Sequence, residues 1–401
     1  MEREQRFHGL DAVRAFALLG GIVLHGTMSF LPDLNSVQWP LADRSPSLTL
    51  EVLFYVIHIF RMATFFLIAG FFAHLLFHRK GPREFIRDRA RRIVAPMLVG
   101  WPILAPLTIG IIIAAAYITF GASIFQQQAP ANGGFPLLHL WFLYYLVIFY
   151  ALALLFRGAI TRWLDANGAI RSFTDRAMRS LVNTELAPLI FATPTVVCLY
   201  FTAGWTWPGI PPADTGLTPK LPTVIAYGLP FVFGWLLHRQ PQLLDVFRKR
   251  WLPHLVVALG ATAAAWYVVG APMRFDALVP AGEVKLAYAV LYTLAMWSWM
   301  FALIGIGMRF FSAASPKLRY IADSSYWMYL VHLPVVWGLA LLMMRWDMHW
   351  SVKFPLLMVA TFGLLLVSYR YLVRNTWIGK ALNGRRIPPA AAPQPQVQSH
   401  A

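Results

Sequence analysis

The residues best suited to chemistry in this sequence lie in its first apolar segment, residues 10–31. Asp11, Arg14 and His25 interrupt a run that is otherwise apolar. On a helix, Arg14 and His25 differ by only about 20° around the axis, and Asp11 lies about 60° from Arg14. The three side chains therefore form one polar stripe about 20 Å long. Because a charge costs roughly 2.5–3.5 kcal/mol at the centre of a membrane helix, this stripe is expected to face a protein interior or a water-filled cavity.

A second polar stripe follows in residues 50–78. Glu51, His58 and Arg61 lie within roughly 80° of one another on a helix. If the two segments pack antiparallel, His25 lies level with residues 54–58. Either histidine could simply form a structural hydrogen bond between helices. Two stripes at matching depth nevertheless favour a shared buried site.

The elements that must position these residues are membrane helices. Of 401 residues, 58% are hydrophobic and 13% are charged, and the mean hydropathy is +0.58. Repeated apolar runs of around twenty residues are typical of a multi-pass membrane protein. The single cysteine, Cys198, excludes an intrachain disulfide framework. We predict an all-α bundle of about ten transmembrane helices, at residues 10–31, 50–78, 93–120, 137–157, 186–204, 222–238, 253–270, 285–311, 322–344 and 354–374.

The distribution of basic residues predicts the orientation of this bundle. With the N-terminus in the cytoplasm, 25 Lys and Arg residues fall in cytoplasmic segments and six in external ones. This asymmetry favours an even number of spans with both termini cytoplasmic. It also accounts for the net charge of +17 without a nucleic-acid partner. Residues 1–386 are expected to form a single transmembrane domain, and residues 387–401 a disordered tail.

The densest basic segment, residues 78–96, separates the second and third predicted spans. Its composition is that of a cytoplasmic loop in contact with anionic membrane lipid. Arg89 and Arg92 are three positions apart and share a face if the segment is helical. Two guanidinium groups placed in this way suit phosphate binding, so the loop could hold a nucleotide-containing donor.

Five stretches occur in an order that resembles the integral-membrane acyltransferase 3 family, over nearly the whole chain. The FRMATFFLIAGFF and HLWFLYYL stretches are most similar to the branch that includes a periplasmic-glucan succinyltransferase. One departure is Ala69, where many members carry Ser. The stretches are LDAVRAFALLGGIVLH (10–25), FRMATFFLIAGFF (60–72), RARRIVAP (89–96), HLWFLYYL (139–146) and SSYWMYLVHLP (324–334).

The resemblance implies an enzyme of the bacterial inner (cytoplasmic) membrane that moves an acyl group, acetyl or succinyl, onto an exported glucan or other saccharide. His25 matches the histidine proposed to be catalytic, with Arg14 on the same helix. Arg89 and Arg92 match the pair proposed to contact the acyl-CoA donor. His332 matches a histidine of less settled role, and by itself it could be a polar tie between helices.

Acyl transfer from a thioester to a hydroxyl needs a base for the hydroxyl proton and a cation near the carbonyl oxyanion. His25 suits the base, or it could carry the acyl group covalently. Arg61 or Arg14 suits the cation, and Asp11 or Glu51 could orient a ring nitrogen or balance an arginine. These expectations make His25, Arg14 and Asp11 the predicted catalytic residues, with substrate contacts from Glu51, His58, Arg61, Arg89, Arg92, His139, Trp141 and His332.

Some of these residues have simpler interpretations. His139 and Trp141 lie at the outer end of a predicted span, where they could meet a sugar or belong to an interfacial aromatic belt. The remaining histidines near span ends are expected to be solvated: His74, His78, His238, His254 and His349.

Other functional classes receive less support from the sequence. A transporter or flippase could use the Asp–Arg–His stripe as a substrate or proton pathway. The basic Arg89 and Arg92 segment and the absence of an evident inverted repeat favour the enzyme. The density of polar groups within the membrane counts against a sensor or scaffold. Because metal-site, phosphate-loop and dinucleotide motifs are missing, acyl-CoA is expected as a substrate and no metal or bound cofactor is expected.

Overall fold

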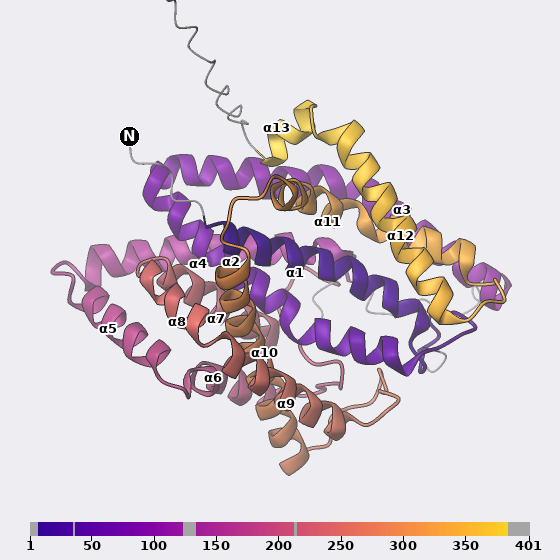
Figure 1. Ribbon diagram of the computed structural model, residues 1–401, viewed down its shortest axis with the longest axis horizontal. Coiled ribbons are helices and arrows are strands. Elements are labelled where there is room, and N and C mark those ends of the chain that lie inside the picture. The colour runs from indigo at the N-terminus through magenta and orange to yellow at the C-terminus, as the bar shows by residue number, and fades with distance from the viewer. Residues whose placement is uncertain (1–6, 35–36, 123–133, 212–214, 384–401) are drawn as a thin grey trace, which may run out of the picture.

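The computed structural model describes residues 7–34, 37–122, 134–211 and 215–383, and α-helices dominate these ranges (Figure 1). The prediction of an all-α membrane protein is confirmed. The disordered tail predicted for residues 387–401 lies outside the described residues. The α-helices are α1 His8–Thr27, α2 Leu48–Arg89, α3 Ala95–Phe120, α4 Trp141–Ala159, α5 Ala169–Asn183, α6 Ala187–Phe201, α7 Leu221–Leu237, α8 Leu244–Lys249, α9 Trp251–Val269, α10 Glu283–Phe310, α11 Pro316–Met343, α12 Trp350–Ser368 and α13 Trp377–Asn383.

Short 3-10 and π-helical turns extend several of these helices. They are η1 Met28–Phe30, η2 Ala90–Val94, η4 Leu138–Leu140, η5 Ile160–Leu164, η6 Pro241–Leu243 and η7 Tyr369–Val373.

The number of spans differs from the predicted ten when it is judged by length and apolarity. Over the described ranges, seven helical runs are long and apolar enough to cross a membrane, or up to nine if each of two bent pairs is one span. The bent pairs are α5 with α6, at 110°, and α7 with the η6–α8 segment, at 112°. One of the seven runs, Leu48–Phe120, has 73 residues and contains both predicted spans 50–78 and 93–120. The total of ten therefore stays a prediction.

This long run is interrupted at Gly81. Gly81 has φ 74°, a conformation that side chains with a Cβ rarely adopt. Pro82 follows it and cannot donate a backbone hydrogen bond. At its other end, α2 begins where the Ser47 hydroxyl accepts a hydrogen bond from the Leu50 amide at 3.3 Å. Local sequence therefore sets both ends of the membrane part of α2.

Glycines allow the helices at the centre of the bundle to touch through their backbones. A methyl group on Gly70 of α2 would overlap the Phe231 carbonyl of α7, and one on Gly234 of α7 would overlap the Leu67 carbonyl of α2. Small residues at such crossings replace the hydrophobic driving force that is missing between helices in lipid. α1 packs against α2, α10 and α11 and runs through the middle of the molecule (Figure 1).

The outer helices present large apolar side chains outward. Leu98 of α3, Leu155 of α4, Val256 of α9 and Val359 of α12 are between 62% and 72% exposed. In an aqueous protein such a surface would be unfavourable, but in lipid it is the expected outer face. The polar stripes of α1 and α2 are consequently directed into the bundle.

The basic segments gather at one end of the bundle, which we call the basic end. Phe7 packs on Phe71 at 5.0 Å and on His238 at 6.5 Å, so the start of α1 meets α2 and the C-terminal end of α7. Arg239 pairs with Asp175 of α5 at 2.7 Å. The segments gathered there include residues 79–92, 157–179 and 239–250, and α5 and α8 lie together at the left of Figure 1.

Candidate active site

Three histidines from separate parts of the chain meet inside the bundle, and we call them the histidine cluster. His25 lies on α1, His139 on η4 and His332 on α11. The ring centroids of His25 and His332 are 5.1 Å apart, and those of His139 and His332 are also 5.1 Å apart. His139 and His332 are buried, and His25 is half-buried. His139 was predicted at a rim, so its place in this cluster is new.

Backbone carbonyls fix the proton positions on two of these rings. Nδ1 of His332 lies 2.5 Å from the Tyr329 carbonyl oxygen, and Nε2 of His139 lies 2.9 Å from the Leu330 carbonyl oxygen. A carbonyl only accepts, so each of these nitrogens carries the proton. Nε2 of His332 and Nδ1 of His139 then hold lone pairs. Among the described residues these two atoms and Nδ1 of His25 have no hydrogen-bond partner.

Arg61 of α2 lies beside this cluster. A methyl group on Gly21 would overlap the Nη1 atom of Arg61, so the guanidinium rests on α1 one turn before His25. The positive charge of Arg61 acts on His25. Within the described ranges no acidic side chain pairs with Arg61, and its Nε is buried without an acceptor. The two predicted polar stripes therefore meet where α1 packs on α2.

The outer part of the α2 stripe is held by other groups. The Glu51 carboxylate accepts a hydrogen bond from the Met273 amide at 2.7 Å, and it is fully buried. Nδ1 of His58 lies 3.3 Å from the Tyr292 hydroxyl of α10. Glu51 thus anchors the segment between α9 and α10 and does not contact His25.

Arg89 and Arg92 lie together at the basic end. Both contact Asp88, through Nη2 of Arg89 at 2.7 Å and Nε of Arg92 at 3.3 Å. Arg89 also donates to the Tyr150 hydroxyl at 3.5 Å. The helical geometry expected for this segment is present, and one carboxylate offsets one of the two positive charges. The pair therefore keeps a net positive charge.

Asp11 and Arg14 form an ion pair of 3.1 Å. Arg14 also lies 5.5 Å from the ring centre of Phe72, and its charge acts on Arg92. Since eleven residues of helix separate it from His25, about 16 Å lies between the two positions. The structure thus groups Asp11 and Arg14 with the basic end and not with the histidine cluster.

A row of α11 side chains joins the basic end to the histidine cluster. The Tyr326 hydroxyl donates to the Arg92 carbonyl at 2.6 Å, and the Tyr329 hydroxyl donates to the His139 carbonyl at 2.7 Å. His332 follows one turn after Tyr329. His332 was predicted as a site residue and Tyr326 was not. Tyr326, Tyr329 and His332 follow one another at intervals of three residues in α11, and this helical spacing could have identified the row.

Aromatic residues cover the outer side of His25. Trp337 of α11 stands edge-on to His25 with centroids 6.0 Å apart, and Trp39 packs on Trp337 at 5.2 Å. Both indole nitrogens are buried without an acceptor in the described chain. Trp141, which was predicted to contact a sugar, stacks on Tyr227 with ring centroids 5.9 Å apart, and its sugar contact stays a prediction.

Two of the five histidines expected to be solvated are buried, so that prediction was wrong for His74 and His254. His74 approaches His238 with 2.7 Å between their Nδ1 atoms, and His254 packs against Phe301 at 5.4 Å. Interhelical packing at the bundle ends covers most of both side chains. His78 and His349 are exposed as expected.

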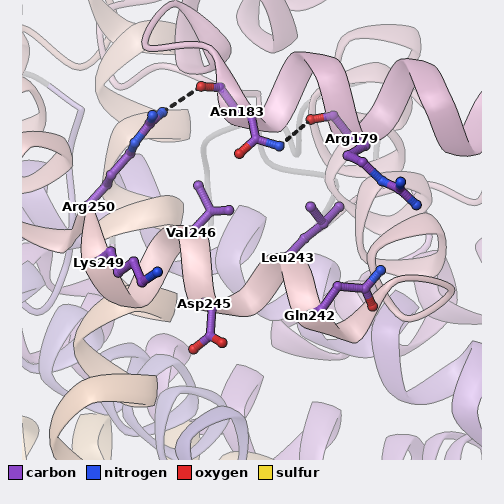
Figure 2. Close-up of a pocket in the computed structure, with 8 residues that line it drawn as sticks. All are labelled: Arg179, Asn183, Gln242, Leu243, Asp245, Val246, Lys249 and Arg250. Carbon is purple, nitrogen blue, oxygen red and sulfur yellow. Dashed lines mark hydrogen bonds between the residues drawn. The ribbon is translucent and has the colours of Figure 1, made fainter.

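Neither of two well-formed cavities contains the histidine cluster. One, of about 530 Å³, lies between the end of α5 and the η6–α8 segment (Figure 2). Arg250 connects its two sides by donating to the Asn183 backbone carbonyl at 2.8 Å, and the Asn183 side chain donates to the Arg179 carbonyl within α5 at 2.7 Å. The other, of about 830 Å³, lies between α2, α4, α5 and α7. Within the described ranges no group of three or more His, Cys, Asp or Glu residues is placed to hold a metal ion.

A multi-pass helical bundle with a buried histidine and arginine site fits a membrane-embedded enzyme or a transporter. A family model described as an acyltransferase domain, that of the acyltransferase 3 family, matches residues 7–370, and this chain belongs to that family. The protein is therefore a membrane acyltransferase that transfers groups other than aminoacyl groups. The family favours the enzyme over the transporter considered above.

Curated relatives agree with the family. Glucans biosynthesis protein C of Escherichia coli strain SMS-3-5 is 25% identical over 348 residues, which cover 82% of each chain. The same protein of Escherichia coli O9:H4 strain HS gives the same identity and coverage. No solved structure matches this chain.

Proposed function

We propose that this protein transfers an acyl group from acyl-CoA, bound at the basic end, to a hydroxyl of a glucan or other exported saccharide. The observation that carries the proposal is the meeting of His25, His332 and Arg61 at one depth inside the bundle. This grouping offers a proton acceptor and a cation in a place that excludes bulk water. Those are the two groups that ester formation from a thioester needs.

The basic end supports the choice of donor. Arg89, Arg92 and Arg14 bring three guanidinium groups close to one another with Asp88 and Asp11 as their acidic partners. Guanidinium groups bind phosphate bidentately. Acyl-CoA carries its phosphates and its thioester at opposite ends of an extended arm. The α11 row from Tyr326 to His332 lies between the basic end and the histidine cluster, along the path that the extended arm of acyl-CoA would follow.

Acyl transfer can be written as a balanced reaction that uses only acyl-CoA, the acceptor hydroxyl, His25 and Arg61. His25 removes the proton from the acceptor hydroxyl as its oxygen attacks the thioester carbonyl, and Arg61 stabilises the oxyanion that forms. Collapse of this intermediate breaks the carbon–sulfur bond and leaves the ester and the CoA thiolate. The imidazolium of His25 then returns the proton to the thiolate. In a covalent variant His25 itself attacks the thioester first.

The aromatic cover of His25 supports a saccharide acceptor. Trp39 and Trp337 offer two buried N–H donors that lack an acceptor in the described residues, and the nearby Ser29 hydroxyl is likewise buried and unpartnered. A polyhydroxylated ligand supplies acceptors for such groups, and sugars pack against aromatic faces. The relatives' name, which refers to glucan biosynthesis, supports a glucan in particular.

We propose that the acyl group is acetyl or succinyl. Arg61 could stabilise the oxyanion or bind the free carboxylate of a succinyl group, and one variant distinguishes these two roles of Arg61. If Arg61 only stabilises the oxyanion, Arg61→Gln lowers kcat/KM for acetyl-CoA and succinyl-CoA by the same factor. If Arg61 binds the free carboxylate of a succinyl group, the loss falls on succinyl-CoA alone. Measuring both donors with one purified variant separates the two roles.

The central experiment is His25→Ala, which is expected to abolish transfer while the protein remains inserted in the membrane. His8→Ala changes the same residue type on the same helix, far from the cluster, and should retain activity. Full activity in His25→Ala would refute the assignment of the base. The proposed placement in the bacterial inner membrane, with both termini cytoplasmic, is tested separately with terminal reporter fusions.

A further inference from the structure

The larger cavity is a cleft that the proposed reaction does not use. It has a volume of about 830 Å³ and lies between α2, α4, α5 and α7 at the basic end. Its lining combines basic and histidine side chains at one end with aromatic and aliphatic side chains along the rest. We call it the α4–α7 cleft.

Among the described residues, Arg157 is the cation of this cleft that lacks a counter-charge. Its guanidinium carbon lies 4.4 Å from the ring centre of Phe77, which holds the group in place. The other two arginines are already paired, Arg171 with Asp165 at 2.6 Å and Arg239 with Asp175 at 2.7 Å. In the described part of the chain no carboxylate pairs with Arg157. Its donors are therefore available to an anion.

Three histidines extend the polar end of the cleft. The rings of His74 and His78 are 4.2 Å apart, and those of His74 and His238 are 4.9 Å apart. The charges of Arg157 and Arg239 act on both His74 and His78. These side chains add hydrogen-bond donors without adding negative charge, so the polar end favours an anion.

The apolar part of the cleft opens toward lipid. Phe156 of α4 and Val232 of α7 both line it and are 63% and 51% exposed. Nearby, Trp163 and Phe173 are 74% and 66% exposed, and α5 is bent by 110° from α6. A helix at this angle with exposed aromatic residues is typical of one that lies in the membrane interface. The polar end of the cleft is therefore at headgroup depth.

We propose that the α4–α7 cleft binds one membrane lipid with an anionic, phosphate-bearing headgroup. The phosphate contacts Arg157 and the neighbouring histidines, and one acyl chain lies along the apolar walls formed by α4 and α7. A free phosphate or a soluble nucleotide would use only the polar end of this site. The depth and the lateral opening point to a lipid.

The test is native mass spectrometry of the full-length protein in detergent, titrated with phosphatidylglycerol or with phosphatidylcholine. Phosphatidylglycerol is expected to bind more tightly, and Arg157→Gln to weaken its binding about tenfold, because a charge-assisted contact is lost. Arg176→Gln removes the same charge from an exposed position of α5 outside the cleft, and it should change binding less than twofold. Thermal unfolding of each variant confirms that it is folded.

A second variant keeps the proposal testable if Arg157→Gln does not fold. Ala153→Phe fills the apolar wall without altering charge, and it should also weaken phosphatidylglycerol binding. Equal losses in the Arg157 and Arg176 variants would overturn the proposal in favour of general surface charge. Unchanged binding in Ala153→Phe would overturn it in favour of a phosphate-only site. Displacement of the lipid by coenzyme A would assign the cleft to the donor instead.

Discussion

Gly21→Ala is the sharpest probe of the arrangement around His25. The added methyl group would overlap Nη1 of Arg61, and ordinary contact requires a shift of that guanidinium by about 1 Å. Because Nη1 is at the end of the flexible Arg61 side chain, the guanidinium can move while α1 and α2 stay in position. Misplacement of a catalytic group by about 1 Å can lower a rate about 100-fold, which corresponds to about 2.7 kcal/mol of transition-state stabilisation.

The neighbouring residue supplies a matched control. A methyl group on Gly20 would meet only Cγ2 of Ile57, at 3.7 Å. Both substitutions replace glycine by alanine in the same helix and raise helix propensity by about 1 kcal/mol. Gly20→Ala should therefore retain activity while Gly21→Ala loses about 99% of kcat.

The assay is transfer of radiolabelled acyl groups from acyl-CoA to a glucan by purified protein in lipid nanodiscs. Thermal unfolding of each variant serves as the folding control. Wild-type kcat in a well-folded Gly21→Ala protein would refute the role given to Arg61. An equal loss in both variants would show that crowding of α1 against α2 matters more than the position of Arg61.

Three further predictions concern stability and donor binding. Lys353→Met should lower the free energy of unfolding by about 3–5 kcal/mol, measured by denaturation in detergent, because it leaves the buried Asp43 without its partner at 2.8 Å; an unchanged midpoint would contradict this. Gly70→Ala should cost about 1–3 kcal/mol, seen as a lower Tm, since its methyl group would overlap a backbone carbonyl of α7 that cannot move alone. Changing Arg89 and Arg92 together to Gln should raise KM for acyl-CoA at least tenfold and leave KM for the glucan unchanged; equal effects on both substrates would contradict the donor site.

Much of the fold was predictable because membrane helices are local elements. Each must satisfy its own backbone hydrogen bonds within one apolar segment, so a run of about twenty apolar residues is a sufficient signal. The predicted spans 10–31 and 137–157 correspond to α1 and α4. The signal is weaker for α6 and α7, which have 15 and 17 residues and are each bent sharply against a neighbouring helix.

The candidate site was predictable in part. Helical periodicity placed His25 and Arg61 in two inward-facing stripes, with His25 level with residues 54–58. The structure sets Arg61 against Gly21, one turn from His25. Periodicity could not show that His139 joins His332, because more than 190 residues separate them. It also could not show that Glu51 is held by the Met273 amide.

What the sequence by itself determined is the class of protein, the polarity of its first two spans and the family. The class and the polarity depend on residue type and on spacing along one helix, which chain geometry fixes locally. The family depends on five short stretches that occur in order along the chain. Only the tertiary structure decided which polar groups meet. Three features depend on how separate helices cross: the histidine cluster, the contact of Arg61 with Gly21 and the α4–α7 cleft. Those crossings follow from close packing between small residues, and no single helix contains that information.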